Sequence, residues 1–238
     1  MPVHVSRTIK GIVRQKMQTA ARGAIIFATG FEDRTISRHF DPNESGTLLE
    51  YVLDSVWTVA DELFVVFNRE PELSTIEVIS PFGVKVLSVA RGQPPVHAIA
   101  GAFKSSKSEH CLLVTERLPL LKPNVALALF EGARANDCSI PRWEDGRIEP
   151  MLAVYRRNVF TRLVNSWKQP FTSNATRDVA AIAGQLFDVK FLSVERDLME
   201  LDPELDSFLE VKDEKSLYLA REKASIKRKR VLLKKIAK

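Results

Sequence analysis

The sequence has little of what marks metal clusters, disulfide frameworks and membrane spans. Its four histidines are scattered, and its two cysteines, Cys111 and Cys138, lack the spacing of metal ligands or of a CxxC motif. No apolar run approaches the roughly 18 residues of a membrane span, and no secretory signal follows Met1. The signatures of Walker-loop NTPases, serine hydrolases, zinc metalloproteases and EF-hands are missing too. We therefore expect a protein of the reducing cytoplasm in which Cys111, within an apolar run, is a buried free thiol.

Positive charge is concentrated at the two ends of the chain. Residues 1–22 carry +5 and residues 221–238 carry +8, so residues 23–220 carry −8 within the net +5. The 238 residues are 45% hydrophobic, which suits one large domain with a filled core. We therefore predict a basic amphipathic N-terminal helix within 1–22, one domain over 23–220 and a basic tail over 221–238. An Arg-rich, acid-free beginning is also typical of an organelle transit peptide.

Apolar patterns of buried strands and of helices alternate along the chain. The strand patterns cover residues 23–27, 63–67, 75–79, 84–89, 111–115, 150–155 and 189–194. The helix patterns cover residues 7–21, 47–61, 95–105, 123–135, 159–167 and 174–186, and another begins at 213. This alternation predicts an α/β fold, a doubly wound, mainly parallel sheet with helices on both faces. The loop 28–43 then lies at the carboxyl end of the first strand, where such sheets bind ligands.

Four segments at predicted strand ends carry motifs. The first has Ala28, Gly30 and Arg34 after an apolar strand, and the second and third lie within 46–68 and 94–102. The fourth, within 140–155, has the pattern Pro-x4-Gly-x2-Glu-Pro-x2-Ala-x-Tyr and is the most specific. In this order and spacing the four segments resemble the MobA-like NTP transferases, a family best known from molybdenum-cofactor guanylyltransferases.

The resemblance implies a Rossmann-like, nucleotide-diphospho-sugar-transferase-like fold and an enzyme that transfers a nucleoside monophosphate from an NTP. The most plausible reaction of this kind moves GMP from GTP to a molybdopterin-type acceptor. The resemblance places the family's nucleotide side at Ala28, Thr29, Gly30, Arg34, Arg38 and Asn68. The residues that match its acceptor side are Glu149, Pro150 and Tyr155.

The sequence departs from the family in the phosphate-binding loop. Thr29 replaces a glycine, and His39 stands where the family has a Lys, with Arg38 beside it as a substitute. Glycines let the backbone approach a nucleotide, and Arg or Lys side chains hold its phosphates. Arg34 is the retained cation of this loop and a candidate catalytic residue.

The sequence also departs at the two positions where the family holds a divalent cation. Arg117 replaces the family's Asp, and Glu210 and Lys212 replace two Asn near the C-terminus. An Arg cannot ligate a cation because it has no acceptor atom. Arg117 and Lys212 could supply the missing metal's charge as catalytic residues. Alternatively, Glu116, with Glu210 or Asp213, could hold Mg²⁺, or catalysis could be lost.

Two other classes of function stay open. A relative that kept the fold but lost the chemistry would act as a binding or scaffold protein. The basic ends, above all residues 221–238, are also suited to contact with nucleic acid. A nucleotide and a pterin-type small molecule are the partners that the resemblance implies.

Overall fold

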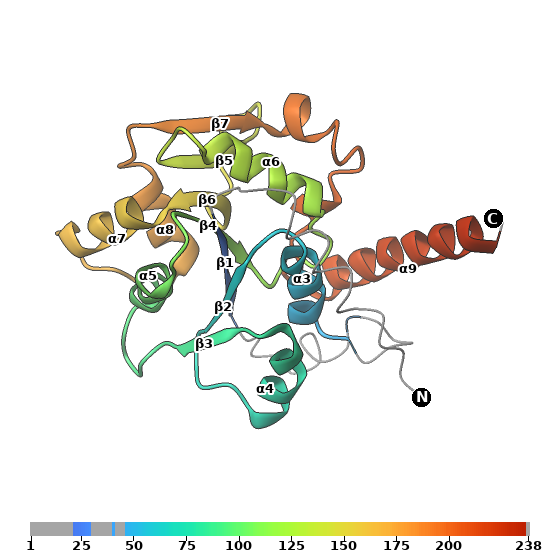
Figure 1. The fold of residues 1–238 in the computed structure, drawn as a ribbon, viewed down its shortest axis with the longest axis horizontal. Helices are drawn as coiled ribbons and strands as arrows, with labels where there is room; N and C mark the ends of the chain where they lie inside the picture. The colour runs from blue at the N-terminus through green and yellow to red at the C-terminus, as the bar shows by residue number, and fades with distance from the viewer. Residues whose placement is uncertain (1–20, 30–39, 41–45, 237–238) are drawn as a thin grey trace.

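The computed structural model describes residues 21–29, 40 and 46–236, and of residues 226–236 only the backbone. The helix predicted over 7–21 and most of the loop 28–43 lie outside the described residues. The described chain forms a seven-stranded sheet in the order β3-β2-β1-β4-β6-β5-β7 (Figure 1). The strands are β1 (Arg22–Ala28), β2 (Glu62–Phe67), β3 (Lys85–Ser88), β4 (His110–Thr115), β5 (Cys138–Arg142), β6 (Leu152–Arg156) and β7 (Val189–Ser193).

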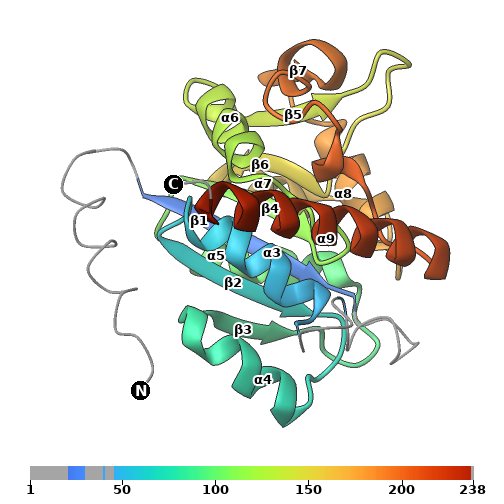
Figure 2. The same ribbon diagram turned by 90° about the vertical axis from the view of Figure 1, so that its right-hand side faces the viewer.

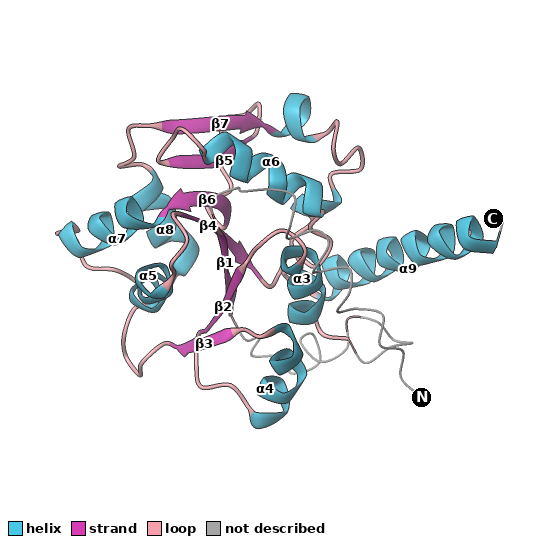
Figure 3. Ribbon diagram, viewed as in Figure 1, coloured by secondary structure: helices cyan, strands magenta, loops and turns pink. Residues whose placement is uncertain are grey.

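Helices cover both faces of this sheet, as Figures 2 and 3 show. They are α3 (Leu48–Trp57), α4 (Leu73–Ile79), α5 (Pro95–Ser105), α6 (Pro123–Ala133), α7 (Arg157–Ser166), α8 (Ala175–Ala183) and α9 (Glu214–Ile236). Helices α3 and α6 pack on one face, and α5, α7 and α8 pack on the other. The predicted doubly wound α/β fold is confirmed.

Strand β1 lies at the centre of this arrangement and is buried on both sides. Its Ala24, Ile26 and Ala28 belong to the core under α3 and α6, whereas Ile25 and Phe27 belong to the core under α5 and α7. Successive side chains of a strand point to opposite faces, so a strand covered on both faces needs a continuous apolar run. This is why the run after Gly23 predicted the strand correctly.

Six of the seven strands run in one direction. Strand β1 pairs in parallel with β2 and β4, β2 pairs with β3, and β5 pairs with β7. Strand β6 is antiparallel to both β4 and β5. The carboxyl ends of β1 to β5 therefore share one edge of the sheet. The chain order changes direction between β1 and β4, and doubly wound sheets bind ligands at such a switch point.

Local sequence fixes where the helices on this edge begin. Thr47 precedes α3 and forms a capping box, in which the Glu50 backbone N–H donates to Thr47 Oγ1 (3.2 Å) and the Thr47 backbone N–H donates to Glu50 Oε2 (2.7 Å). Pro95 and Pro123 are the first residues of α5 and α6, where a missing backbone N–H costs no hydrogen bond.

The predicted set of strands needs correction at two places. Residues 75–79 form part of α4, because Ile76 and Ile79 are three residues apart and both pack on the core under α3, which a helix allows. Strand β5 was not predicted, since Ser139 and Pro141 interrupt its apolar pattern. It forms because β6 and β7 supply hydrogen-bonding partners on both of its edges.

The last helix, α9, crosses the boundary predicted at residue 220. It begins at Glu214 and continues to Ile236, so the basic run extends a helix whose first half packs on the domain. Figure 1 shows its far end projecting beyond the other helices. Contact of this basic end with nucleic acid stays a prediction.

Both cysteines are buried free thiols, as expected for Cys111. Burial raises the pKa of the Cys111 thiol to about 11, so it is protonated at neutral pH. No helix in the described part of the chain combines the length and apolar character needed to cross a membrane.

Candidate functional site

Two clefts flank the end of β1 at the shared carboxyl edge. The first, the β4 cleft, has a volume of about 470 Å³ and lies where β4 and β5 end and β6 begins. The second, the β2 cleft, has a volume of about 650 Å³ and lies where β2 and β3 end, with Asn68 and Gly92 in its wall. Because β1 lies between β2 and β4 in the sheet, the loop after Ala28 starts between the two clefts.

A tight loop between β5 and β6 forms one wall of the β4 cleft. The Trp143 backbone N–H donates to the Arg147 carbonyl (2.8 Å), and Gly146 adopts a φ of +89°, a conformation that favours glycine. The Trp143 indole N–H donates to Glu149 Oε1 (2.6 Å). The Arg147 guanidinium lies over the Trp143 ring, 5.1 Å from its centroid. The loop thus presents an aromatic ring, a cation and a carboxylate together.

The Glu149 carboxyl is partly buried in the wall of this cleft. Burial raises the pKa of Glu149 above its ordinary value, and the neighbouring Glu210 carboxylate adds to this effect. The hydrogen bond from Trp143 and the charges of Arg147 and Lys212 act in the opposite direction. Glu149 is therefore protonated over a wider pH range than an exposed glutamate.

The acceptor-side role predicted for Tyr155 is wrong, because its side chain is fully buried. Its ring packs against Phe103 and Phe160 under α5 and α7. Its hydroxyl donates to the carbonyl of Pro150 (2.8 Å), which lines the β4 cleft. Tyr155 thus supports the cleft wall from inside the core and does not reach a ligand.

Glu116 joins the end of β4 to the loop that follows β1. The backbone N–H of Glu116 donates to the Phe27 carbonyl (3.1 Å), which extends the pairing of the two strands. The Thr29 hydroxyl donates to Glu116 Oε1 (2.9 Å), and the Glu116 side chain is only 5% exposed. The carboxylate therefore faces the chain itself.

The next residue, Arg117, meets the C-terminal segment of the domain. Arg117 Nη1 lies 3.6 Å from Glu210 Oε1, and Lys212 Nζ lies 2.9 Å from Glu210 Oε2. The Val211 backbone N–H donates to the Arg117 carbonyl (2.8 Å). The residues predicted at the two metal positions are therefore neighbours, although they are distant in the sequence.

Comparison with known proteins decides the family. The model of the MobA-like NTP transferase domain matches residues 40–179, more than half of the chain. The chain belongs to the MobA-like NTP transferase family. A probable molybdenum cofactor guanylyltransferase of Methanosarcina mazei is 26% identical over 204 residues, which are 83% of this chain and 88% of the relative. The match begins after residues 28–39, the loop that departs from the family signature.

Solved structures agree on the fold. Molybdopterin-guanine dinucleotide biosynthesis protein A from Archaeoglobus fulgidus has a TM-score of 0.64 at 20% identity, covering 85% of this chain and 98% of that one. The 4-diphosphocytidyl-2C-methyl-D-erythritol synthase of Anaerococcus prevotii has a TM-score of 0.61 at 14% identity, covering 87% and 96%. The fold is therefore that of the nucleotidyltransferases.

The residues present do not fit a divalent cation at the position where the MobA-like family is expected to hold it. Arg117 is a cation there, and Glu116 is buried and hydrogen-bonded to Thr29. Among the described residues, His, Cys, Asp and Glu side chains nowhere gather in a group of three or more that could ligate a metal.

The predicted nucleotide residues are only partly described. Gly30, Arg34 and Arg38 lie outside the described residues. Asn68 follows β2, donates its backbone N–H to the Ala28 carbonyl (2.9 Å) and lines the β2 cleft with an exposed side chain. The Ala28 side chain is 1% exposed, so only its backbone remains for a ligand.

A buried aspartate anchors the segment that leads to Glu210 and Lys212. Asp202 is fully buried, accepts from the Ser207 backbone N–H (2.7 Å) and forms an ion pair with Lys122 at the start of α6. Burial alone would raise the pKa of Asp202, but the hydrogen bonds from Lys122 and Ser207 lower it. Asp202 therefore ties the segment around Phe208 to the start of α6.

Trp143, Arg147 and Phe208 line the β4 cleft but were not predicted as site residues. Trp143 and Arg147 lie inside the specific motif over 140–155. The sequence signal that could have identified them is the pairing of an aromatic and a basic residue in a short loop at a strand end. Phe208 packs edge-on against Trp143, with 5.4 Å between ring centroids. That contact joins segments far apart in sequence, so no local pattern indicated it.

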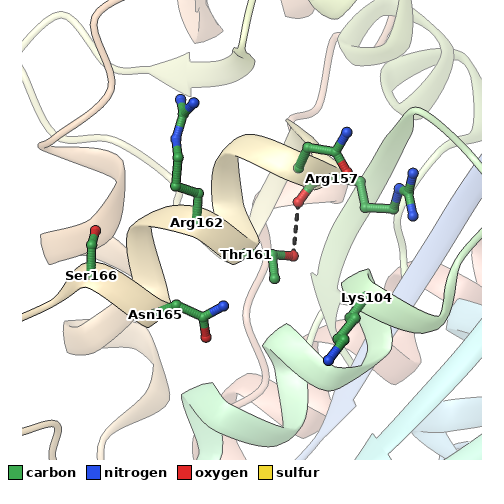
Figure 4. A pocket seen from close by; sticks show the side chains of 7 residues that line it. Lys104, Arg157, Thr161, Arg162, Asn165 and Ser166 are labelled. Atoms are coloured by element: carbon green, nitrogen blue, oxygen red, sulfur yellow. Dashed lines mark hydrogen bonds between the residues drawn. The ribbon is translucent and has the colours of Figure 1, made fainter.

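A further pocket of about 470 Å³ lies beside α7, near its contact with α5. Arg157 lines it and follows the end of β6, at the edge of the sheet where β4 begins, opposite to the two clefts. Figure 4 shows that Lys104 and Arg162 point in different directions, so their charges do not converge. This pocket is separate from the candidate site and supplies control positions for experiments on it.

Proposed function

We propose that this chain transfers GMP from GTP to a molybdopterin-type acceptor. An acceptor phosphate oxygen bonds to the α-phosphorus of GTP, the bond from that phosphorus to the bridging oxygen breaks, and pyrophosphate leaves. Charge builds up on the phosphoryl oxygens as this happens. The single observation that carries the proposal is the pair of clefts flanking the end of β1, one of them built by the Glu149-Pro150 motif.

The two clefts suggest how the substrates divide. The guanosine lies in the β2 cleft beside Asn68, the acceptor lies in the β4 cleft, and the phosphates cross the end of β1 at Thr29. In the β4 cleft, Glu149 accepts a hydrogen bond from a heterocycle N–H, held in place by Trp143. Arg147 above the same ring faces an acceptor phosphate. A planar, phosphorylated heterocycle suits such a wall.

Isothermal titration with GTP, CTP and ATP, with and without Mg²⁺, tests the nucleotide part. GTP should bind most tightly, and Asn68→Ala should weaken it about tenfold, the loss of roughly one good hydrogen bond. Asn165→Ala, in the pocket beside α7, is the matched control and should leave the affinity unchanged. Failure of all three nucleotides to bind in both conditions would overturn the proposal.

A non-catalytic relative is the second candidate, and Arg117 at the family's metal position favours it. Pyrophosphate release with GTP and a molybdopterin acceptor separates the two. Turnover that Lys212→Met reduces would refute the non-catalytic alternative. Nucleotide binding without any pyrophosphate release would instead support a binding or scaffold role and refute the transferase.

A further inference from the structure

We propose that Arg117 and Lys212 replace the divalent cation, so that this chain binds nucleotide phosphates without a metal. The inference rests on the proposed function, since it concerns the phosphates of the same nucleotide. It goes further by assigning the phosphate-binding charge to two named side chains and by removing a metal requirement. The resemblance alone left this open, because shifted carboxylate ligands and lost catalysis were alternatives to it.

Hydrogen bonds of both its N–H and its carbonyl fix the backbone of Arg117. Its backbone N–H donates to Thr115 Oγ1 (3.4 Å), and its carbonyl accepts from the Val211 N–H (2.8 Å). The side chain is 32% exposed and reaches Glu210. Arg117 directly follows Glu116, whose carboxylate accepts from Thr29, the residue at which the proposed function places the phosphates.

The charge of the cluster equals that of the site it replaces. A divalent cation on one Asp carries a net charge of +1. Arg117 and Lys212 around the single carboxylate of Glu210 also carry +1. Glu210 pairs with both cations and thereby offsets the repulsion between their like charges.

The carboxylates that would have to bind a shifted metal are already engaged. Glu116 is 5% exposed and accepts from Thr29, while Glu210 is paired with two cations. The Asp213 carboxylate accepts from the Ser216 N–H (2.8 Å) at the start of α9. A metal at Glu116 or Glu210 would therefore displace existing hydrogen bonds or ion pairs and meet the charge of Arg117.

Lys212 is the side chain that can turn to a phosphate. It is 64% exposed and its ion pair with Glu210 is a surface pair, which is weak and easily exchanged. Its flexible ammonium group is suited to an oxygen of a phosphate. Arg117 stays with Glu210 and supplies fixed charge, whereas Lys212 supplies the direct contact.

GTP binding to the full chain in excess EDTA and in excess Mg²⁺ tests the inference. The two dissociation constants should agree within about threefold. Lys212→Met should weaken binding about tenfold in EDTA, and Mg²⁺ should not restore it, whereas Lys212→Arg should bind nearly as the parent does. Lys104→Met, which removes a charge in the pocket beside α7, is the matched control.

The outcomes separate the inference from the proposed function. Binding of GTP only when Mg²⁺ is present would overturn the inference and leave the proposed function standing. Binding of GTP in neither condition would overturn the proposed function itself. If GTP binds without a metal and Lys212→Met leaves the affinity unchanged, the assignment of the phosphate-binding charge to Lys212 would be overturned.

Arg117 contributes to folding contacts, so its variants need a fold check. Arg117→Lys keeps the charge and should keep GTP affinity within about threefold in EDTA, while Arg117→Met should lose about tenfold. Circular dichroism identifies a variant that has not folded. If Arg117→Met does not fold, the GTP affinity of the Lys212 variants tests the inference, because Lys212 is exposed. Manganese titration by electron paramagnetic resonance, without nucleotide, should detect no tight site, and a tight site would overturn the inference.

Discussion

Replacing the mostly buried carboxylate of Glu62 with the amide of glutamine should lower the stability of the fold. Glu62 begins β2, and its Oε2 accepts from Ser106 Oγ (2.8 Å), the Lys107 N–H (2.8 Å), the Ser108 N–H (3.1 Å) and Ser108 Oγ (3.0 Å). Its Oε1 pairs with Lys85 Nζ at 3.1 Å. One carboxylate thereby holds the turn between α5 and β4 against β2.

The size of the effect follows from the titration of this carboxyl. Burial by itself would raise its pKa, but the hydrogen bonds outweigh burial and lower the pKa of Glu62 from 4.5 to about 2. Such a fall corresponds to about 3 kcal/mol at neutral pH, and access of water to the Lys85 pair reduces it. We expect Glu62→Gln to lower the free energy of unfolding by about 2 to 3 kcal/mol at pH 7.

The pH dependence has a definite sign. Since the folded pKa is below the unfolded one, the stabilisation is complete above the unfolded pKa and is lost as pH falls from 4.5 toward about 2. Urea unfolding followed by circular dichroism should show the difference between parent and Glu62→Gln shrinking at about pH 3. Glu77→Gln, on the exposed side of α4, is the control and should change stability by less than about 0.5 kcal/mol. Two results would refute the reasoning. One is a loss of less than about 0.5 kcal/mol for Glu62→Gln at pH 7, and the other is a loss at about pH 3 that is as large as the loss at pH 7.

Three further changes test the support of the β4 cleft. Tyr155→Phe leaves a buried carbonyl without its donor and should cost about 1 to 2 kcal/mol in urea unfolding, whereas no cost would mean that the hydroxyl is not needed. Asp202→Asn breaks the ion pair with Lys122 and should cost about 2 to 3 kcal/mol, with a weaker GTP affinity as the second readout. Trp143→Phe removes the donor to Glu149 and should raise the pKa of that carboxyl, followed by NMR titration. An unchanged or lower pKa would contradict the hydrogen bond's role.

Much of the fold was predictable because the central strands are buried on both faces. Strands such as β1 and β4 consist of continuous apolar runs, and this signal does not depend on distant residues. The segment 75–79 misled because a short apolar run fits a strand or a helix equally well. Strand β5 lacks such a run, and its place in the sheet is decided by β6 and β7.

The site divides in the same way. The Glu149-Pro150 motif lies within one short loop, and the sequence alone predicted its position at a strand end, where the structure has it. Tyr155 was misassigned because strand alternation from Leu152 onward turns it toward the core under α5 and α7. The cluster of Arg117, Glu210 and Lys212 was open to three interpretations, since its ion pairs join a strand end to the C-terminal segment.

The reversed direction of β6 has a consequence for how this family can diversify. The loop over 143–149 lies at the edge of the sheet that holds the β4 cleft, and strand β6 then runs away from this edge. The tip of the loop, residues 143–147, lies outside the paired residues of β4, β5 and β6, whereas Ile148 bridges to Arg142 and the Glu149 N–H donates to the Pro141 carbonyl. Under the proposed function, exchanging the tip of this loop between family members would transfer a preference for one acceptor to another core.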